Sequence, residues 1–235
     1  MDELWLRRFR PRAEGAAHLV CFPHAGGSAT YYQPMSKRLP PEFDLLAVQY
    51  PGRQDRRREP FVRDLVSLAD RISEVLAEIE GPLVFFGHSM GAVVAYETAR
   101  RLAPDKLFAS GRRAPSLRMH TAIHQRDDAG LVAEMRKVGG TDGRLFADRE
   151  LLESVLPVVR NDYRAVETYV WPPGPPLDCP VTVVVGDADP QTTIDDAAAW
   201  RAHTSGPFDL HIMSGGHFYL DHHLDEVIKL ISLAR

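Results

Sequence analysis

The pentapeptide Gly87-His88-Ser89-Met90-Gly91 constrains the fold of this 235-residue chain more than any other stretch. It follows directly on an apolar run at 83–86, which is typical of a buried strand, and leads into a helix-like segment at 92–97. A serine with glycines two positions before and after it predicts a tight turn from strand to helix, which lifts the Ser89 hydroxyl above the edge of a sheet. The alternative is a turn with an incidental serine, and the flanking strand and helix argue against it.

The composition is that of a globular protein with one large core, because 44% of the residues are apolar and 9% are aromatic. A net charge of −4 gives no reason to expect nucleic acid or a membrane surface as the main partner. No stretch approaches the roughly 20 apolar residues of a membrane span, and the start of the chain lacks the order of a secretory signal, so we expect a cytoplasmic protein. Cys21 and Cys179 fit reduced thiols better than a disulfide framework.

Strand-like and helix-like segments alternate along most of the chain. This alternation predicts an α/β fold with a mostly parallel central sheet flanked by helices. After a weak edge strand at 4–9, we expect strands at 18–22, 43–50, 83–86, 107–110, 181–185 and 209–213. The apolar spacing predicts helices at 31–39, at 62–80, from the serine turn to Leu102, at 194–204 and in the closing segment around 224–231.

The alternation stops at 111–179, where a connection usually needs only about 2–6 residues. We expect a helical insertion there, before the penultimate strand, and a core made of 1–110 and 180–235. Amphipathic stripes predict two helices in the insertion, at 131–138 and 152–170, and Pro157 should kink the second. Most of this apolar surface must pack on the body of the protein. Beside the edge that carries the serine, it also suits a lid over a channel for an apolar substrate.

A serine hydroxyl needs a base within reach and an acid that orients the base. His217 is the predicted base, because it lies on the loop after the last strand, at the same sheet edge as the serine turn. Three other histidines are less well placed. His211 lies within that strand, and His222 and His223 begin the closing helix. No carboxylate spacing around these histidines supports a metal site.

Two carboxylates compete for the role of the acid, on the loop after 181–185. We favour Asp189 over Asp187, because Asp189 has cleared the end of the strand. Some proteins carry this acid one strand earlier, but there the chain reads Ser110-Gly111-Arg112-Arg113 and has no carboxylate. The resulting order, serine before aspartate before histidine, is that of the α/β-hydrolase fold.

The segment Pro23-His24-Ala25-Gly26-Gly27 follows the first buried strand. Its glycines let the backbone come close to a ligand, and α/β-hydrolases place one N–H donor of an oxyanion hole at this point. The other donor would be the N–H of Met90, directly after the serine. A plain glycine-rich turn is the alternative interpretation of 23–27.

Five segments together make the chain resemble the type II thioesterases, the stand-alone editing hydrolases of polyketide and nonribosomal peptide synthases. They are 22–27, 50–53, 87–91, 110–115 and 215–218. The resemblance implies hydrolysis of acyl groups from the phosphopantetheine arm of an acyl or peptidyl carrier protein. It implies Ser89, Asp189 and His217 as the catalytic triad, and Ala25 and Met90 as oxyanion donors. No metal or organic cofactor is implied, since the phosphopantetheine belongs to the substrate, and we expect a monomer.

Six arginines form two clusters in the sequence. A charge run is most often a solvated loop, but carrier proteins are typically acidic, so these arginines are also candidates for a docking patch. They are Arg53, Arg56, Arg57, Arg58, Arg112 and Arg113.

Two other functions stay open at this point. The same triad would serve a carboxylester hydrolase or lipase that acts on free small esters. A chain that keeps the fold without catalysis would be a binding module.

Overall fold

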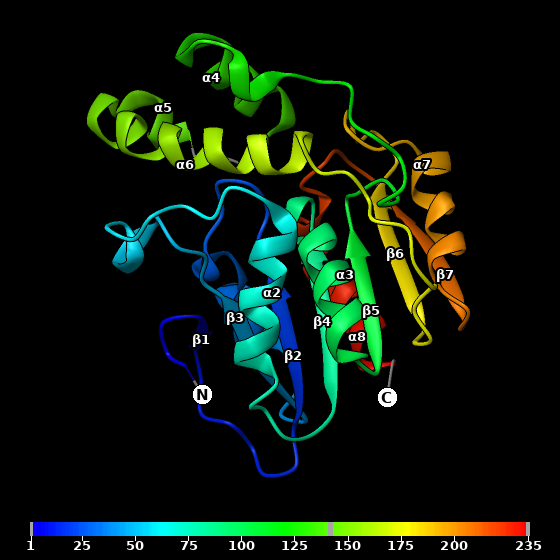
Figure 1. Ribbon diagram of the computed structural model, residues 1–235. Helices are drawn as coiled ribbons and strands as arrows, with labels where there is room; N and C mark the ends of the chain where they lie inside the picture. The colour runs from blue at the N-terminus through cyan, green and yellow to red at the C-terminus, as the bar shows by residue number, and fades with distance from the viewer. Residues whose placement is uncertain (1, 141–142, 234–235) are drawn as a thin grey trace.

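One seven-stranded sheet forms the centre of the computed structural model, which describes residues 2–140 and 143–233 (Figure 1). The strand order is β1-β3-β2-β4-β5-β6-β7. The short edge strand β1 (Leu6–Arg8) is antiparallel to its neighbour, and the remaining strands are parallel. These are β2 (Ala17–Phe22), β3 (Phe43–Val48), β4 (Leu83–His88), β5 (Lys106–Ser110), β6 (Val181–Gly186) and β7 (Phe208–Met213). The predicted α/β architecture with a mostly parallel sheet is confirmed.

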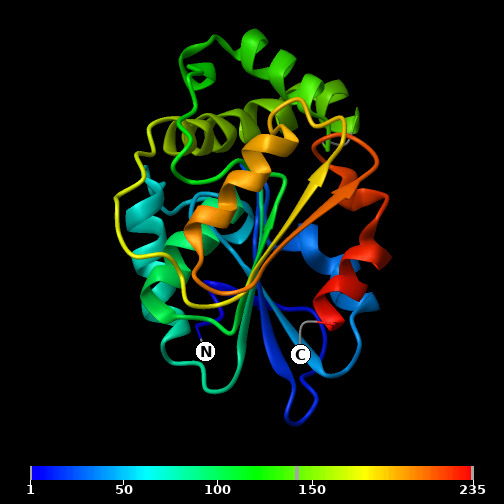
Figure 2. The same cartoon turned by 90° about the vertical axis from the view of Figure 1, so that its right-hand side faces the viewer.

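Helices cover both faces of this sheet (Figure 2). On one face lie α2 (Leu65–Leu76), α3 (Met90–Leu102) and α7 (Ile194–Ala198), which continues as the 3-10 helix η4 (Ala199–His203). On the other face lie α8 (Leu224–Ser232) and α1 (Gln33–Arg38), the latter preceded by η1 (Ala29–Tyr32). Two further 3-10 turns, η2 (Gln54–Arg56) and η5 (Tyr219–Asp221), lie in loops.

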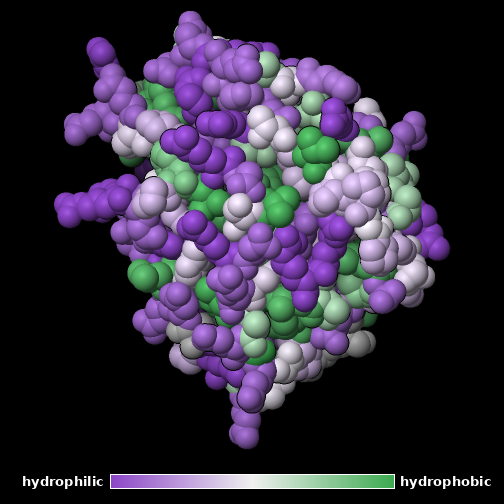
Figure 3. All heavy atoms as spheres, in the orientation of Figure 1, coloured by the Kyte–Doolittle hydropathy of each residue, from purple (hydrophilic) through white to green (hydrophobic). Residues whose placement is uncertain are grey.

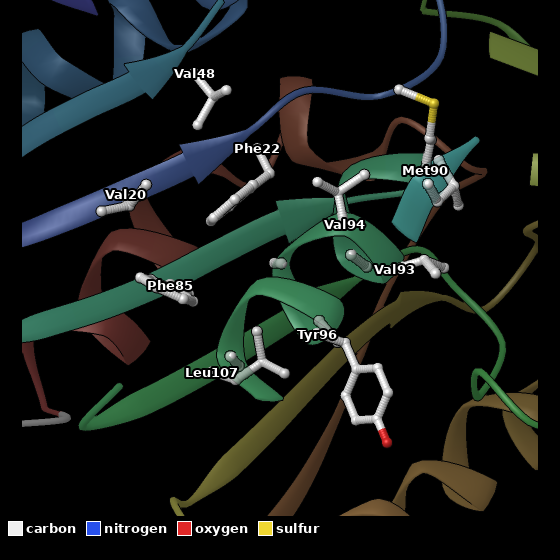
Figure 4. Packing of buried hydrophobic residues seen from close by; sticks show 14 of the residues in the cluster. Val20, Phe22, Val48, Phe85, Met90, Val93, Val94, Tyr96 and Leu107 are labelled. Atoms are coloured by element: carbon white, nitrogen blue, oxygen red, sulfur yellow. The ribbon is translucent and has the colours of Figure 1, made fainter. Parts of the chain in front are cut away.

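The alternation of side chains along each buried strand divides the core in two. Val20 and Phe85 point to the face covered by α3, where they pack with Val94 and Tyr96 (Figure 4). Their sequence neighbours, such as Phe86, point to the opposite face and pack under α1 and α8. A parallel sheet that is buried on both faces needs such continuous apolar strands.

Four helical segments, which we call the lid helices, lie above the ends of the parallel strands (Figure 1). They are η3 (Ile123–Gln125), α4 (Asp128–Val138), α5 (Gly143–Ala147) and α6 (Arg149–Glu167). The two helices predicted in the insertion are present, and α6 continues through Pro157. The short α5 was not predicted. The bounds of the insertion at 111–179 stay a prediction.

One predicted bound differs from the observed one because a capping residue sets where the helix begins. Helix α2 begins after Asp64, whose carboxylate accepts a hydrogen bond from Ser67 N, and not at 62. Val62 and Ile79, which belonged to the predicted stripe, still pack on the core from the loops on either side of the helix. None of the helices in 2–140 and 143–233 is both long and apolar enough to cross a membrane.

Candidate active site

The serine turn has the geometry that its glycines predict. Ser89 lies between β4 and α3 with φ 54° and ψ −116°, a conformation that is strained for a residue with a side chain. A Cβ atom on Gly87 would lie 2.2 Å from Gly91 O, and one on Gly91 would lie 1.9 Å from Phe22 O. Both positions therefore exclude any side chain, and the turn holds Ser89 at the N-terminus of α3.

The structure brings the three predicted side chains together in one hydrogen-bonded line. His217 Nε2 lies 2.9 Å from Ser89 Oγ, and His217 Nδ1 lies 2.8 Å from Asp189 Oδ2. All three residues follow parallel strands, which end at the same edge of the sheet. The side chains of His217 and Asp189 are 2% and 0% exposed, so water competes little for this line of contacts.

The two competing carboxylates have different partners. Asp189 uses its second oxygen to accept the N–H of Gln191 at 2.8 Å, which fixes the carboxylate beside His217. Asp187 is exposed and accepts the N–H of Gly215 at 2.9 Å, so it holds the loop after β7 instead.

Among the described residues, His217 is the histidine that is hydrogen-bonded to Ser89. His211 lies in β7 opposite Val184 of β6, and His223 Nε2 lies 3.0 Å from Ser214 Oγ.

The loop after β2 places the second predicted donor next to the serine. Ala25 and Met90 line the same cavity as Ser89. Within the described residues, the N–H groups of Ala25 and Met90 donate to no other protein group. The next N–H, that of Gly26, is occupied, because it donates to Asp162 Oδ2 at 2.8 Å. Two residues that line the cavity of Ser89 therefore have N–H groups available for a ligand.

The contact between Gly26 and Asp162 is part of a larger connection that the sequence did not reveal. Asp162 lies on α6 and accepts two hydrogen bonds from buried Arg53, at 2.7 and 2.9 Å. Arg53 also donates to Gly27 O at 2.9 Å. The loop that carries Ala25 is thus tied to a lid helix by a buried ion pair. One signal was present, since Asp162 interrupts the apolar stripe of α6 between Val159 and Val166.

A cavity of about 250 Å³ opens at Ser89. The lid helices provide most of its apolar wall: Met135, Val138, Leu145, Val155, Val159 and Val166. Seen from the side of Figure 1, hydrophilic side chains cover most of the outer surface of these helices (Figure 3). The apolar stripes predicted for the insertion therefore face the cavity and the body of the protein.

The comparison with known protein families matches residues 17–234 to the family described as "Thioesterase domain". The chain belongs to this thioesterase family.

Two similar proteins are named for biosynthetic pathways, and a third is named as a thioesterase. A probable cadicidin biosynthesis thioesterase from Streptomyces griseus is 52% identical over 98% of this chain, and the chain spans 65% of that relative. Thioesterase PikA5 from Streptomyces venezuelae is 49% identical over 97% of this chain and 84% of its own length. The solved structure of the type II thioesterase BorB from the borrelidin cluster superimposes with a TM-score of 0.92 at 46% identity, covering 98% of this chain and 97% of BorB. The predicted α/β-hydrolase fold and the resemblance to type II thioesterases are confirmed.

Two further histidines of the thioesterase lie beside His217 and are uncharged near neutral pH. Burial, with smaller effects from His217 and Arg53, lowers the pKa of His24 to about 3. Burial also lowers the pKa of His88 well below its usual value, and His88 Nδ1 lies 2.8 Å from Ser110 Oγ. The neutral ring of His88 packs against His217, with ring centres 5.2 Å apart, and the His24 ring lies behind it, 6.0 Å from His88, so neither adds a second positive charge there.

The predicted docking patch is wrong for three of its six arginines, because Arg53, Arg56 and Arg112 are buried. Arg56 donates to Gln49 O and to Glu59, and its guanidinium lies 4.1 Å from the centre of the Trp5 ring. Arg53 and Arg56 are paired with carboxylates inside the protein, since a buried guanidinium needs partners that replace water, and Arg112 lines the cavity of Ser89. Arg57 and Arg58 are exposed and Arg113 is partly exposed.

Proposed function

We propose that this chain hydrolyses acyl thioesters on the phosphopantetheine arm of acyl or peptidyl carrier proteins, and so releases aberrant or stalled acyl groups from a polyketide or nonribosomal peptide synthase. The main support is the line of contacts from Asp189 through His217 to Ser89, which opens into an apolar cavity under the lid helices. The relatives named as thioesterases of biosynthetic pathways support the substrate class.

In the proposed first half of the reaction, Ser89 Oγ attacks the thioester carbonyl while His217 Nε2 takes its proton. The N–H groups of Ala25 and Met90 bind the oxyanion of the tetrahedral intermediate, and loss of one such donor typically costs about 10²–10³ in rate. Asp189 holds the ring of His217 and stabilises its charged form. The C–S bond then breaks, and His217 returns the proton to the leaving sulfur.

In the second half, His217 takes a proton from water, which attacks the acyl-serine carbonyl. The ester bond breaks, Ser89 recovers its proton from His217, and the free carboxylic acid leaves. These steps use no metal or organic cofactor. A thiol with a pKa of about 8.5 leaves more easily than an alcohol, so the site is better matched to thioesters than to oxygen esters.

The size of the cavity favours short acyl groups. About 250 Å³ is slightly below the range of about 300–1,000 Å³ that is usual for ligand pockets. A long acyl chain would extend beyond this volume, either through the open side of the cavity or against displaced lid helices.

The deciding experiment compares two substrates with the same acyl group, one a carrier-bound thioester and the other an oxygen ester. We expect the thioester to be hydrolysed with a kcat/KM at least about tenfold higher, and Ser89→Ala to lower kcat by about 10⁴-fold or more. Faster hydrolysis of the oxygen ester would favour a carboxylester hydrolase. Absence of Ser89 labelling by a fluorophosphonate probe would indicate a binding module.

A further inference from the structure

One buried cation in the wall of the cavity has no role in the proposed steps. Arg112 follows β5 on the segment Ser110-Gly111-Arg112-Arg113, is only 6% exposed, and lines the same cavity as Ser89. Its backbone carbonyl accepts a hydrogen bond from Trp200 Nε1 at 2.8 Å, which fixes the loop. The backbone at Arg112 is therefore held by the core and not by the lid helices.

The Arg112 guanidinium lacks an oxygen partner among the described residues. Its Nη1 donates to Met119 Sδ at 3.1 Å, and a thioether is a weak acceptor. Its Nε is buried without a partner. The other two buried arginines differ, because Arg53 is paired with Asp162 and Arg56 with Glu59. A buried guanidinium with unused donors is costly, unless a ligand supplies the missing acceptor.

The groups around Arg112 do not supply this acceptor. The carboxylate of Asp189 is in electrostatic contact with Arg112, but its oxygens are hydrogen-bonded to His217 and to the N–H of Gln191. Tyr163 and Tyr169 also face Arg112, and neither accepts a hydrogen bond from it. Burial lowers the pKa of Arg112 to about 10, so the side chain is still charged at neutral pH.

We propose that Arg112 donates a hydrogen bond to an oxygen atom of the acyl group, and that it thereby selects oxygen-bearing acyl groups over plain alkyl groups of the same length. The proposal rests on the proposed thioesterase function and names a specificity residue for it. A hydroxyl, ketone or carboxylate on the acyl chain would each provide the acceptor. The apolar wall from the lid helices would hold the carbon atoms of the same chain.

The test uses three pantetheine thioesters with four-carbon acyl groups: butyryl, 3-hydroxybutyryl and succinyl. For the unmodified protein, we expect kcat/KM for at least one oxygen-bearing substrate to exceed kcat/KM for butyryl by about tenfold or more. This ratio is the effect expected when one substrate makes a single hydrogen bond to a charged group and the other substrate does not. Arg112→Met should bring this ratio close to one, and Arg112→Lys should restore part of it. The matched control is Arg118→Met, which removes an exposed arginine from the same loop region and should leave the ratio unchanged.

Two results would overturn the proposal. One is a ratio at or below one in the unmodified protein, which needs no variant and so does not depend on the folding of Arg112→Met. The other is an equal loss on all three substrates in Arg112→Met, which would mean that Arg112 acts on Asp189 or on the shared pantetheine arm. Fluorophosphonate labelling of Ser89 in each variant shows that the site is folded. Failure to hydrolyse any of the three thioesters would instead count against the proposed function.

Discussion

The serine turn and the lid helices are held in place by different kinds of contact. At the turn, backbone atoms leave no room for change, since even a methyl group on Gly87 or Gly91 would overlap the backbone. The lid helices have a small apolar cluster of their own and connect to the catalytic edge through side chains, above all Asp162 with Arg53 and Gly26. The proposed chemistry therefore resides in the rigid part, and the acyl-binding wall in the part that can adjust.

The largest effect on kcat is expected from a substitution at the rigid catalytic edge of the sheet. Asp189→Asn should lower kcat by about 10⁴-fold, because the amide cannot hold the His217 ring in the required tautomer. Asp187→Asn should lower kcat less than about threefold, since Asp187 only accepts the N–H of Gly215. Steady-state kinetics on one carrier-bound thioester measures both variants. The opposite order of effects would transfer the role of the acid to Asp187.

A smaller effect on kcat/KM is expected from a substitution at the contact between lid helix α6 and the loop that carries Ala25. Asp162→Asn should lower kcat/KM by about 10- to 100-fold, because the loop that carries Ala25 loses its attachment to α6. It should also lower the free energy of unfolding by about 3 kcal/mol, since Arg53 is left with an unpaired buried charge. Kinetics and urea denaturation measure the two effects.

The matched control for Asp162→Asn is Asp128→Asn, which removes an exposed lid carboxylate paired with Arg160. It should change the free energy of unfolding by less than about 1 kcal/mol. If the two variants behaved alike, the lid helices would not position the oxyanion loop.

Acid should lower the free energy of unfolding through the histidine His24, which lies near His217. His24 has a pKa of about 3 in the folded protein and about 6.5 when unfolded, so the unfolded chain binds more protons between these values. Stability therefore falls as the pH drops below about 6.5, by about 2 kcal/mol for this residue at about pH 5. Thermal unfolding at constant ionic strength measures the loss. His24→Asn should make the loss smaller, and an unchanged pH dependence would show that His24 does not contribute.

The smallest effect is expected at the surface. If the exposed arginines guide an acidic carrier protein, Arg57→Glu combined with Arg58→Glu should raise KM for the carrier-bound substrate about threefold at low salt. KM for the free pantetheine thioester should not change. Equal KM values with and without the substitutions on the carrier-bound substrate would remove these arginines from the docking surface.

The features that were predictable from sequence follow from a local glycine pattern and from the order of the parallel strands. The glycine spacing around Ser89 predicts its turn, and the parallel strand order brings His217 and Asp189 to the same edge. The pairing of Arg53 with Asp162 joins residues 109 positions apart, and nothing in the run 53–58 distinguishes an inward-pointing arginine from an exposed one. Helix α5 is too short to show an apolar period.

The backbone conformation of Ser89 lowers the stability of the fold at the same position that supplies the proposed nucleophile. A non-glycine residue at φ 54° with ψ −116° costs on the order of 1–3 kcal/mol, and glycine would relieve most of that cost. A library of variants ranked by thermal resistance alone would therefore favour Ser89→Gly, an exchange that deletes the proposed nucleophile. Comparing the melting temperatures of Ser89→Gly and Ser89→Ala would measure this penalty, because both lack the hydroxyl and only glycine gains backbone freedom. A directed-evolution screen of this chain should therefore measure thioester hydrolysis as well as thermal stability.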